Sequence, residues 1–233
     1  LFIPVEIVLK VIPEILFVLL LLIVYLICKT LTDRKDAALF ATFVSGFISI
    51  FILNTLNIAS VYSLVLLVMF YMFYCFVRMV KHRKYTNRFI LASMLLPLIH
   101  QTALIFVFTM IFYLILVVSE DKRIHNLRKE VVLFSSFFII LVEFVIYKDA
   151  FLTYGFDQVL SNSSNIAFGS FANGIFVIIN WLSVTALVLG SLAVFYGMFK
   201  AKKRVVMLFS SVIISALFLS LIKLIDLYLG MML

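Results

Sequence analysis

Residues 88–118 read RFILASMLLPLIHQTALIFVFTMIFYLILVV, an apolar run that holds a proline, a histidine and a glutamine near its middle. A helix of this length would extend about 46 Å, whereas the hydrocarbon core of a bilayer is about 30 Å thick. The run is therefore longer than one upright span needs. Because proline lacks a backbone donor and disfavours helix at the preceding residue, the sequence predicts a bend between Pro97 and Gln101.

The composition of the whole chain is that of a membrane protein. Of its 233 residues, 66% are hydrophobic and 13% are charged, whereas soluble domains are about half apolar and about a quarter charged. Six further apolar stretches surround the central run: 11–29, 37–53, 58–80, 131–148, 172–198 and 205–230. The predicted fold is all-α, a polytopic transmembrane helical bundle in which 1–233 form a single domain surrounded by the lipid bilayer.

Four connectors between the apolar stretches are strongly basic, and they determine the expected topology. They are 29–36, 78–88, 119–130 and 200–204, and they hold sixteen of the 19 Lys and Arg residues. The connectors 54–60 and 149–171 hold none. Because positively charged loops stay in the cytoplasm, the basic connectors are expected inside and the other two outside. This pattern explains the net charge of +8 without a nucleic-acid partner.

Both flanks of 88–118 are basic, so both ends of this run are expected on the cytoplasmic side. A single span cannot begin and end on one side, and the run is therefore predicted to be a hairpin of two short helices. With this pair the chain has about eight membrane segments, and both of its termini are expected outside. An external start without a signal peptide predicts a fragment that lacks an N-terminal span. The segment 149–171 is predicted to be an external loop with a short interfacial helix.

Six polar residues are candidates for a substrate-binding site on the external side. His100 and Gln101 lie at the predicted bend, where irregular backbone inside a membrane must be buried in protein or line a cavity. The other four lie in or beside the external connectors: Asn54, Asn57, Tyr62 and Asp157. The structural alternative for His100 is a side chain that bonds a carbonyl freed by the bend.

Ionisable residues inside apolar stretches are functional candidates by default, but several here have structural interpretations. Lys223 and Asp226 are one helical turn apart and can pair. Glu143 lies near the end of its stretch, where an interfacial position or a pairing with Lys148 is expected. The sequence has no His and Cys spacing typical of a metal site and no phosphate-binding glycine loop. No metal is predicted, and the cofactor stays unknown.

Three stretches resemble the membrane core of GT-C-type glycosyltransferases: VYLICKTLTDRKDAALFATFVSG (24–46), NTLNIASVYSLVLLVMFYMFYCFVR (54–78) and NRFILASMLLPLIHQTALIF (87–106). Those enzymes often show a short basic loop, an Ala-rich helix, a polar external mouth and two short helices with a histidine at the bend, as at His100. The resemblance implies a polyprenyl-phosphate-linked sugar donor used at the external face, in surface glycan or glycoprotein assembly. The family's catalytic acid follows its first span, and no residue here matches it, so it is expected outside this fragment.

Two other functions stay open at this point. EpsG-like polysaccharide polymerases also resemble 87–106, with a histidine in a similar run. A transporter, or a subunit of a membrane complex, would equally explain a broken helix beside a cavity. An acidic pair in an upstream segment would favour the transferase, and an inverted repeat would favour the transporter.

Overall fold

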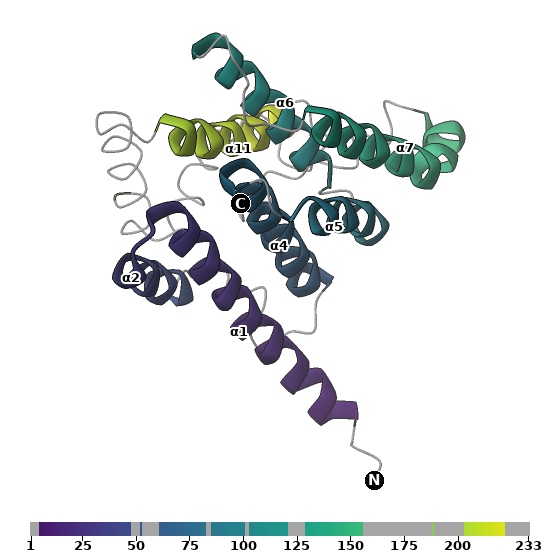
Figure 1. Cartoon of the computed structure of the whole chain (residues 1–233). Coiled ribbons are helices and arrows are strands. Elements are labelled where there is room, and N and C mark those ends of the chain that lie inside the picture. Colours follow the sequence, from purple (N-terminus) through teal and green to yellow (C-terminus); the bar gives the residue numbers. More distant parts are fainter. Residues whose placement is uncertain are drawn as a thin grey trace. The chain divides into compact units, whose positions relative to one another are not determined.

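The computed structural model describes residues 5–47, 52, 61–82, 85–100, 103–120, 129–155, 188 and 203–221. Within these ranges every regular element is an α-helix, so the all-α prediction is confirmed for this part of the chain (Figure 1). The helices are α1 (Val5–Thr32), α2 (Lys35–Gly46), α4 (Val61–His82), α5 (Thr86–Ile99), α6 (Ala103–Glu120), α7 (Lys129–Tyr154) and α11 (Lys203–Leu221). The chain divides into two compact units, with a boundary between Phe89 and Ile90 in α5. Unit 1 holds α1, α2 and α4, and unit 2 holds most of α5 together with α6, α7 and α11.

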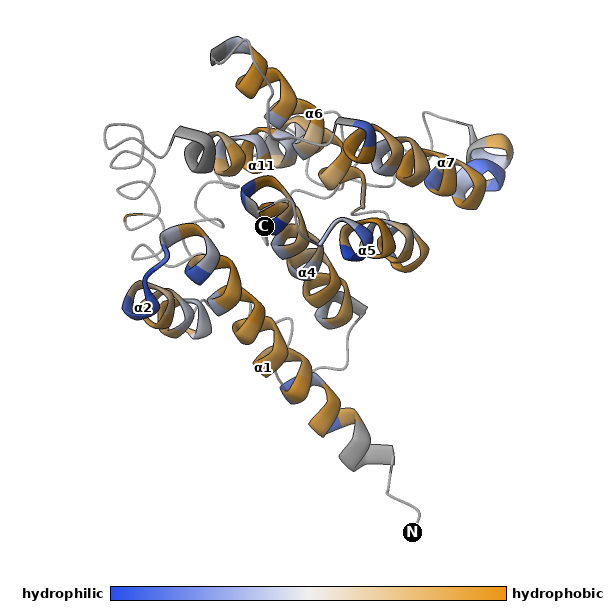
Figure 2. Ribbon diagram, viewed as in Figure 1, coloured by the Kyte–Doolittle hydropathy of each residue, from blue (hydrophilic) through white to orange (hydrophobic). Residues whose placement is uncertain are grey.

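Three of the described helices contain stretches that are long and apolar enough to cross a membrane. They are Leu9–Thr32, Ser63–Lys81 and Glu130–Asp149, with 24, 19 and 20 residues, close to the roughly 20 that a bilayer requires. Figure 2 shows apolar residues along most of α1, α6 and α7, with polar residues gathered near helix ends. These helices indicate an integral membrane protein in contact with lipid. The total of about eight segments stays a prediction.

In unit 1, α1 packs against both α2 and α4. A stripe of α1 residues at helical spacing is buried: Leu20, Ile23, Val24, Ile27 and Leu31. The core of the same unit includes these buried residues of α4: Val65, Leu66, Met69, Met72 and Phe76. At the end of α2, a Cβ atom on Gly46 would lie 3.6 Å from the Leu21 side chain. Helix α2 therefore returns along α1.

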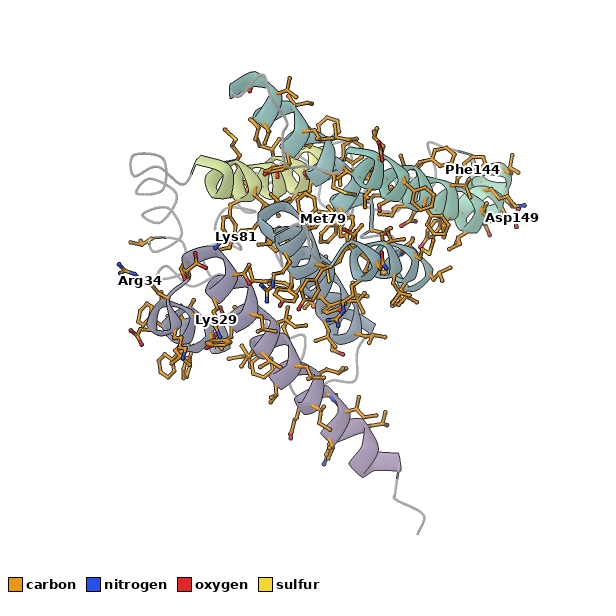
Figure 3. The ribbon with its side chains drawn as sticks, viewed as in Figure 1. Lys29, Arg34, Met79, Lys81, Phe144 and Asp149 are labelled. Atoms are coloured by element: carbon orange, nitrogen blue, oxygen red, sulfur yellow. The ribbon has the colours of Figure 1, made fainter. Side chains whose placement is uncertain are left out.

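The turn between α1 and α2 is fastened to the end of α4. Asp33 adopts a φ of 60°, a left-handed conformation that Asp tolerates better than most residues, and its N–H donates to the Lys29 carbonyl at 3.0 Å. Lys81 of α4, labelled in Figure 3, donates to the Thr30 carbonyl and forms an ion pair of 2.6 Å with the Asp33 carboxylate. Two of the basic connectors recognised in the sequence are thus joined in space.

In unit 2, α6 packs against both α11 and α7. Phe218 of α11 lies 5.2 Å from Phe108 and 5.7 Å from Phe112 of α6, measured between ring centroids. A buried stripe of α11 carries two small hydroxyl residues between two leucines: Leu208, Ser211, Ser215 and Leu219. The serine hydroxyls donate to carbonyls of their own helix. Small residues of this kind allow close approach between membrane helices.

The central apolar run is interrupted inside the predicted interval. Helix α5 ends at Ile99 and α6 begins at Ala103, which gives helices of 14 and 18 residues. The interruption does not lie at Pro97 itself. Helix α5 continues for two residues beyond the proline, and the His100 N–H still donates to the Leu96 carbonyl at 3.0 Å. A proline near a helix end removes only one bond of the ladder, so the last turn can be completed.

The predicted external segment 149–171 begins as a continuation of α7. This helix ends at Tyr154 and is followed by Gly155 with a φ of 76°, the left-handed conformation common just after a helix. Residues 156–171 lie outside the described part of the chain. The external position and the interfacial helix therefore stay predictions.

Candidate functional site

His100 is the predicted site residue whose side chain the structure describes. It is half-buried at the end of α5, and its carbonyl accepts a hydrogen bond from the Ala103 N–H at 3.4 Å. The His100 N–H also donates to the Leu96 carbonyl, so the backbone of His100 is hydrogen-bonded to both α5 and α6. Leu96 and Ala103 are fully buried. His100 is thus flanked by a packed residue on either side.

The structure does not bring the other predicted site residues together with His100. Gln101, Asn54, Asn57 and Asp157 lie outside the described residues, as do Lys223 and Asp226. Tyr62 belongs to the first turn of α4, but its side chain is not among those described. The external pocket that these residues were expected to form therefore stays a prediction.

A second candidate, Glu143 of α7, has an environment that the sequence interpretation missed. Its side chain is only 5% exposed, and neither carboxylate oxygen has a hydrogen-bond partner among the described residues. The expected pairing with Lys148 is wrong, because Lys148 is exposed and residues five apart do not share a helix face. Glu143 instead ends a buried stripe at helical spacing: Val132, Ser135, Ile139 and Glu143.

Outside this stripe, the middle of α7 is mostly apolar and exposed. Phe144 projects from the helix next to Glu143 (Figure 3), and other large apolar side chains are exposed along the same helix: Leu133, Phe134, Phe137, Ile140, Leu141, Val145 and Ile146. So much exposed apolar surface is typical of contact with lipid. Glu143 is therefore held on the protein-facing stripe of a lipid-facing helix, which makes it a functional candidate.

A metal centre finds no support in the described ranges. They contain no group of three His, Cys, Asp or Glu residues that could hold a metal ion. The two candidate residues, His100 and Glu143, offer an imidazole at a helix break and a buried carboxyl group. Both residues belong to unit 2.

Comparisons of the chain with protein-family models, with curated proteins and with solved structures found no match.

Proposed function

We propose that the protein is a membrane glycosyltransferase, which takes a sugar from a polyprenyl-phosphate donor at the external face for surface glycan or glycoprotein assembly. The observation that carries the proposal is the break between α5 and α6, which places His100 between two apolar helices. The same function is implied by the resemblance to GT-C-type enzymes, which covers 24–46, 54–78 and 87–106. A lipid-linked donor also suits a protein with lipid-facing helices, because its prenyl tail stays in the bilayer.

The proposed reaction is a substitution at the anomeric carbon of the donor sugar. A hydroxyl oxygen of the acceptor forms a new bond to this carbon, and the bond from the carbon to the phosphate oxygen breaks. The electron pair leaves with the polyprenyl phosphate, and the hydroxyl proton passes to a general base. We assign His100 as a hydrogen-bond donor to the phosphate or to a sugar hydroxyl.

Replacement of His100 by alanine tests this assignment. We expect the rate of transfer from a polyprenyl-phosphate sugar to fall by roughly 5- to 150-fold, which corresponds to the loss of one hydrogen bond to a charged or polar group. The measurement uses membranes that carry the full-length protein, with wild type and His100→Ala at matched expression. His82→Ala, in a basic connector, is the matched control and should keep wild-type transfer.

The His100 variants distinguish a side chain that binds the donor from one that only bonds a backbone carbonyl. If His100 only bonds a backbone carbonyl, His100→Asn keeps most of the transfer and of the thermal stability. Unchanged transfer by His100→Ala removes His100 from the site. Absence of transfer by the wild type from every such donor contradicts the transferase itself. Products with many added repeat units would favour the EpsG-like polymerase over a transferase that adds one sugar.

A second candidate function is favoured by Glu143. A buried carboxyl group inside a membrane helix is typical of proton-coupled transporters. In proteoliposomes with an imposed pH gradient, such a transporter would dissipate the gradient when its solute is added, and Glu143→Gln would abolish this effect. A transferase would show sugar transfer without any solute-dependent change in the gradient.

A further inference from the structure

Two arginines surround one tyrosine ring where α4 is followed by α5. The Cζ atom of Arg88 lies 4.8 Å from the ring centroid of Tyr85, and that of Arg78 lies 5.2 Å from the same centroid. Arg78 also donates from Nε to the Tyr74 hydroxyl at 3.1 Å. The rings of Tyr74 and Tyr85 meet edge to face, 5.7 Å apart. All four residues belong to unit 1, and together they form what we call the Arg–Tyr cluster.

The guanidinium groups of the Arg–Tyr cluster lack a counter-ion in the described part of the chain. Lys81, almost one turn after Arg78 on α4, has its charge paired with Asp33. Neither Arg78 nor Arg88 has such a carboxylate partner among the described residues. Two like charges around one ring repel each other. An anion bound to both would remove this repulsion, and guanidinium groups suit the oxygens of a phosphate in particular.

A third donor lies next to the cluster in the sequence. Thr86, the first residue of α5, is 9% exposed, and its hydroxyl has no hydrogen-bond partner in the described ranges. Its neighbour Tyr85 adopts a φ of 69°, which is uncommon for a residue with a side chain and concentrates at functional sites. The first N–H groups of α5 have no partner within the helix. Unpaired N–H groups at a helix start and arginine side chains both favour an anion.

The position of the Arg–Tyr cluster at the helix ends indicates which kind of anion binds there. The candidate span Ser63–Lys81 ends here, and the apolar helix Thr86–Ile99 begins here. In a membrane, such ends lie at the level of the lipid headgroups, where basic residues attract anionic lipids and tyrosines are enriched. We propose that Arg78, Arg88 and Thr86 bind the phosphodiester headgroup of an anionic phospholipid, with Tyr85 holding both guanidinium groups in place. This site belongs to unit 1 and is independent of the proposed transferase.

The test is a titration of the purified protein with phosphatidylglycerol, followed by native mass spectrometry, with phosphatidylcholine as the zwitterionic comparison. The wild type is expected to retain phosphatidylglycerol in preference to phosphatidylcholine. The double variant Arg78→Gln/Arg88→Gln should bind phosphatidylglycerol roughly tenfold more weakly or worse. The control Arg34→Gln/Lys35→Gln removes the same charge from two exposed residues and should bind within about twofold of wild type.

Two results would overturn the proposal. One is equal loss of phosphatidylglycerol binding in the cluster variant and in the control, which would show attraction to net charge alone. The other is competition by soluble glycerol phosphate at the concentration at which phosphatidylglycerol saturates, which would assign the site to a soluble phosphate compound. The single variant Arg88→Gln keeps the bond between Arg78 and Tyr74, and it should still weaken binding if the double variant fails to fold. Wild-type binding by a folded Arg88→Gln protein would also contradict the proposal.

Discussion

Replacement of Glu143 by leucine is expected to raise the free energy of unfolding by about 1–3 kcal/mol. The reason is that the carboxyl group of Glu143 is buried without a hydrogen-bond partner among the described residues, and a buried polar group that lacks a partner destabilises the folded state by about this amount. Leucine has a similar volume and no group to desolvate. Thermal unfolding in detergent, followed by circular dichroism, measures the change.

The matched control for this variant is Glu130→Leu. Glu130 is exposed in the first turn of α7, where a carboxylate is slightly favourable beside the helix N-terminus. Its removal should leave stability unchanged or lower it by less than about 1 kcal/mol. A clear loss of stability in Glu143→Leu would mean that the carboxyl group has a structural partner. A gain in stability together with a loss of activity would show that Glu143 is kept for function.

Replacement of Ile140 by arginine is expected to prevent α7 from entering the membrane normally. Ile140 is 49% exposed and lies in the middle of the candidate span Glu130–Asp149. Arginine at the centre of a membrane helix costs about 2.5–3.5 kcal/mol on insertion, whereas an exposed substitution on a water-facing helix usually changes stability by less than about 0.5 kcal/mol. The measurement is the amount of protein that stays in alkali-washed membranes.

Tyr154→Arg provides the control for this second variant. Tyr154 is exposed at the end of α7, beyond the candidate span, so an arginine there can reach the membrane surface. This variant should accumulate in membranes as the wild type does. Wild-type accumulation of Ile140→Arg as well would contradict lipid contact on this face of α7.

The helix break was predictable because it follows from two independent sequence signals. The basic flanks of 88–118 predict that the run begins and ends on one side, and Pro97 marks where the helix is weakest. The exact residues were not predictable, because a proline near the end of a helix leaves the last turn free to form. The structure therefore places the break after Ile99, two residues beyond the proline.

The environment of Glu143 could not be predicted from hydropathy alone. Most positions of α7 between Val131 and Ile146 are apolar, so the pattern does not show which face is directed toward protein. In the structure the buried face of α7 carries two polar residues on one stripe, Ser135 and Glu143. The spacing of Ser135 and Glu143 along the helix was a usable signal, but proximity to Lys148 in the sequence led to the wrong expectation of a surface pair.

The Arg–Tyr cluster could not be predicted from the sequence for a different reason. In the sequence, Arg78 and Arg88 are recognisable only as part of a basic connector, which is sufficient to predict topology. The helical spacing of Tyr74 and Arg78 predicts a contact on α4. The approach of Tyr85 and Arg88 depends on the left-handed backbone at Tyr85, which the sequence does not reveal.

The proposed function requires that 88–118 enters the membrane and returns, so that both basic flanks lie in the cytoplasm. Cysteine labelling with a membrane-impermeant maleimide measures this in a variant in which Cys28 and Cys75 are replaced by alanine. Single cysteines are placed at Lys84, Lys122 and Ser163. We predict that Lys84→Cys and Lys122→Cys react only in inside-out vesicles and that Ser163→Cys reacts in intact cells. Reaction of positions 84 and 122 from opposite sides of the membrane would contradict the hairpin, and with it the external site at His100.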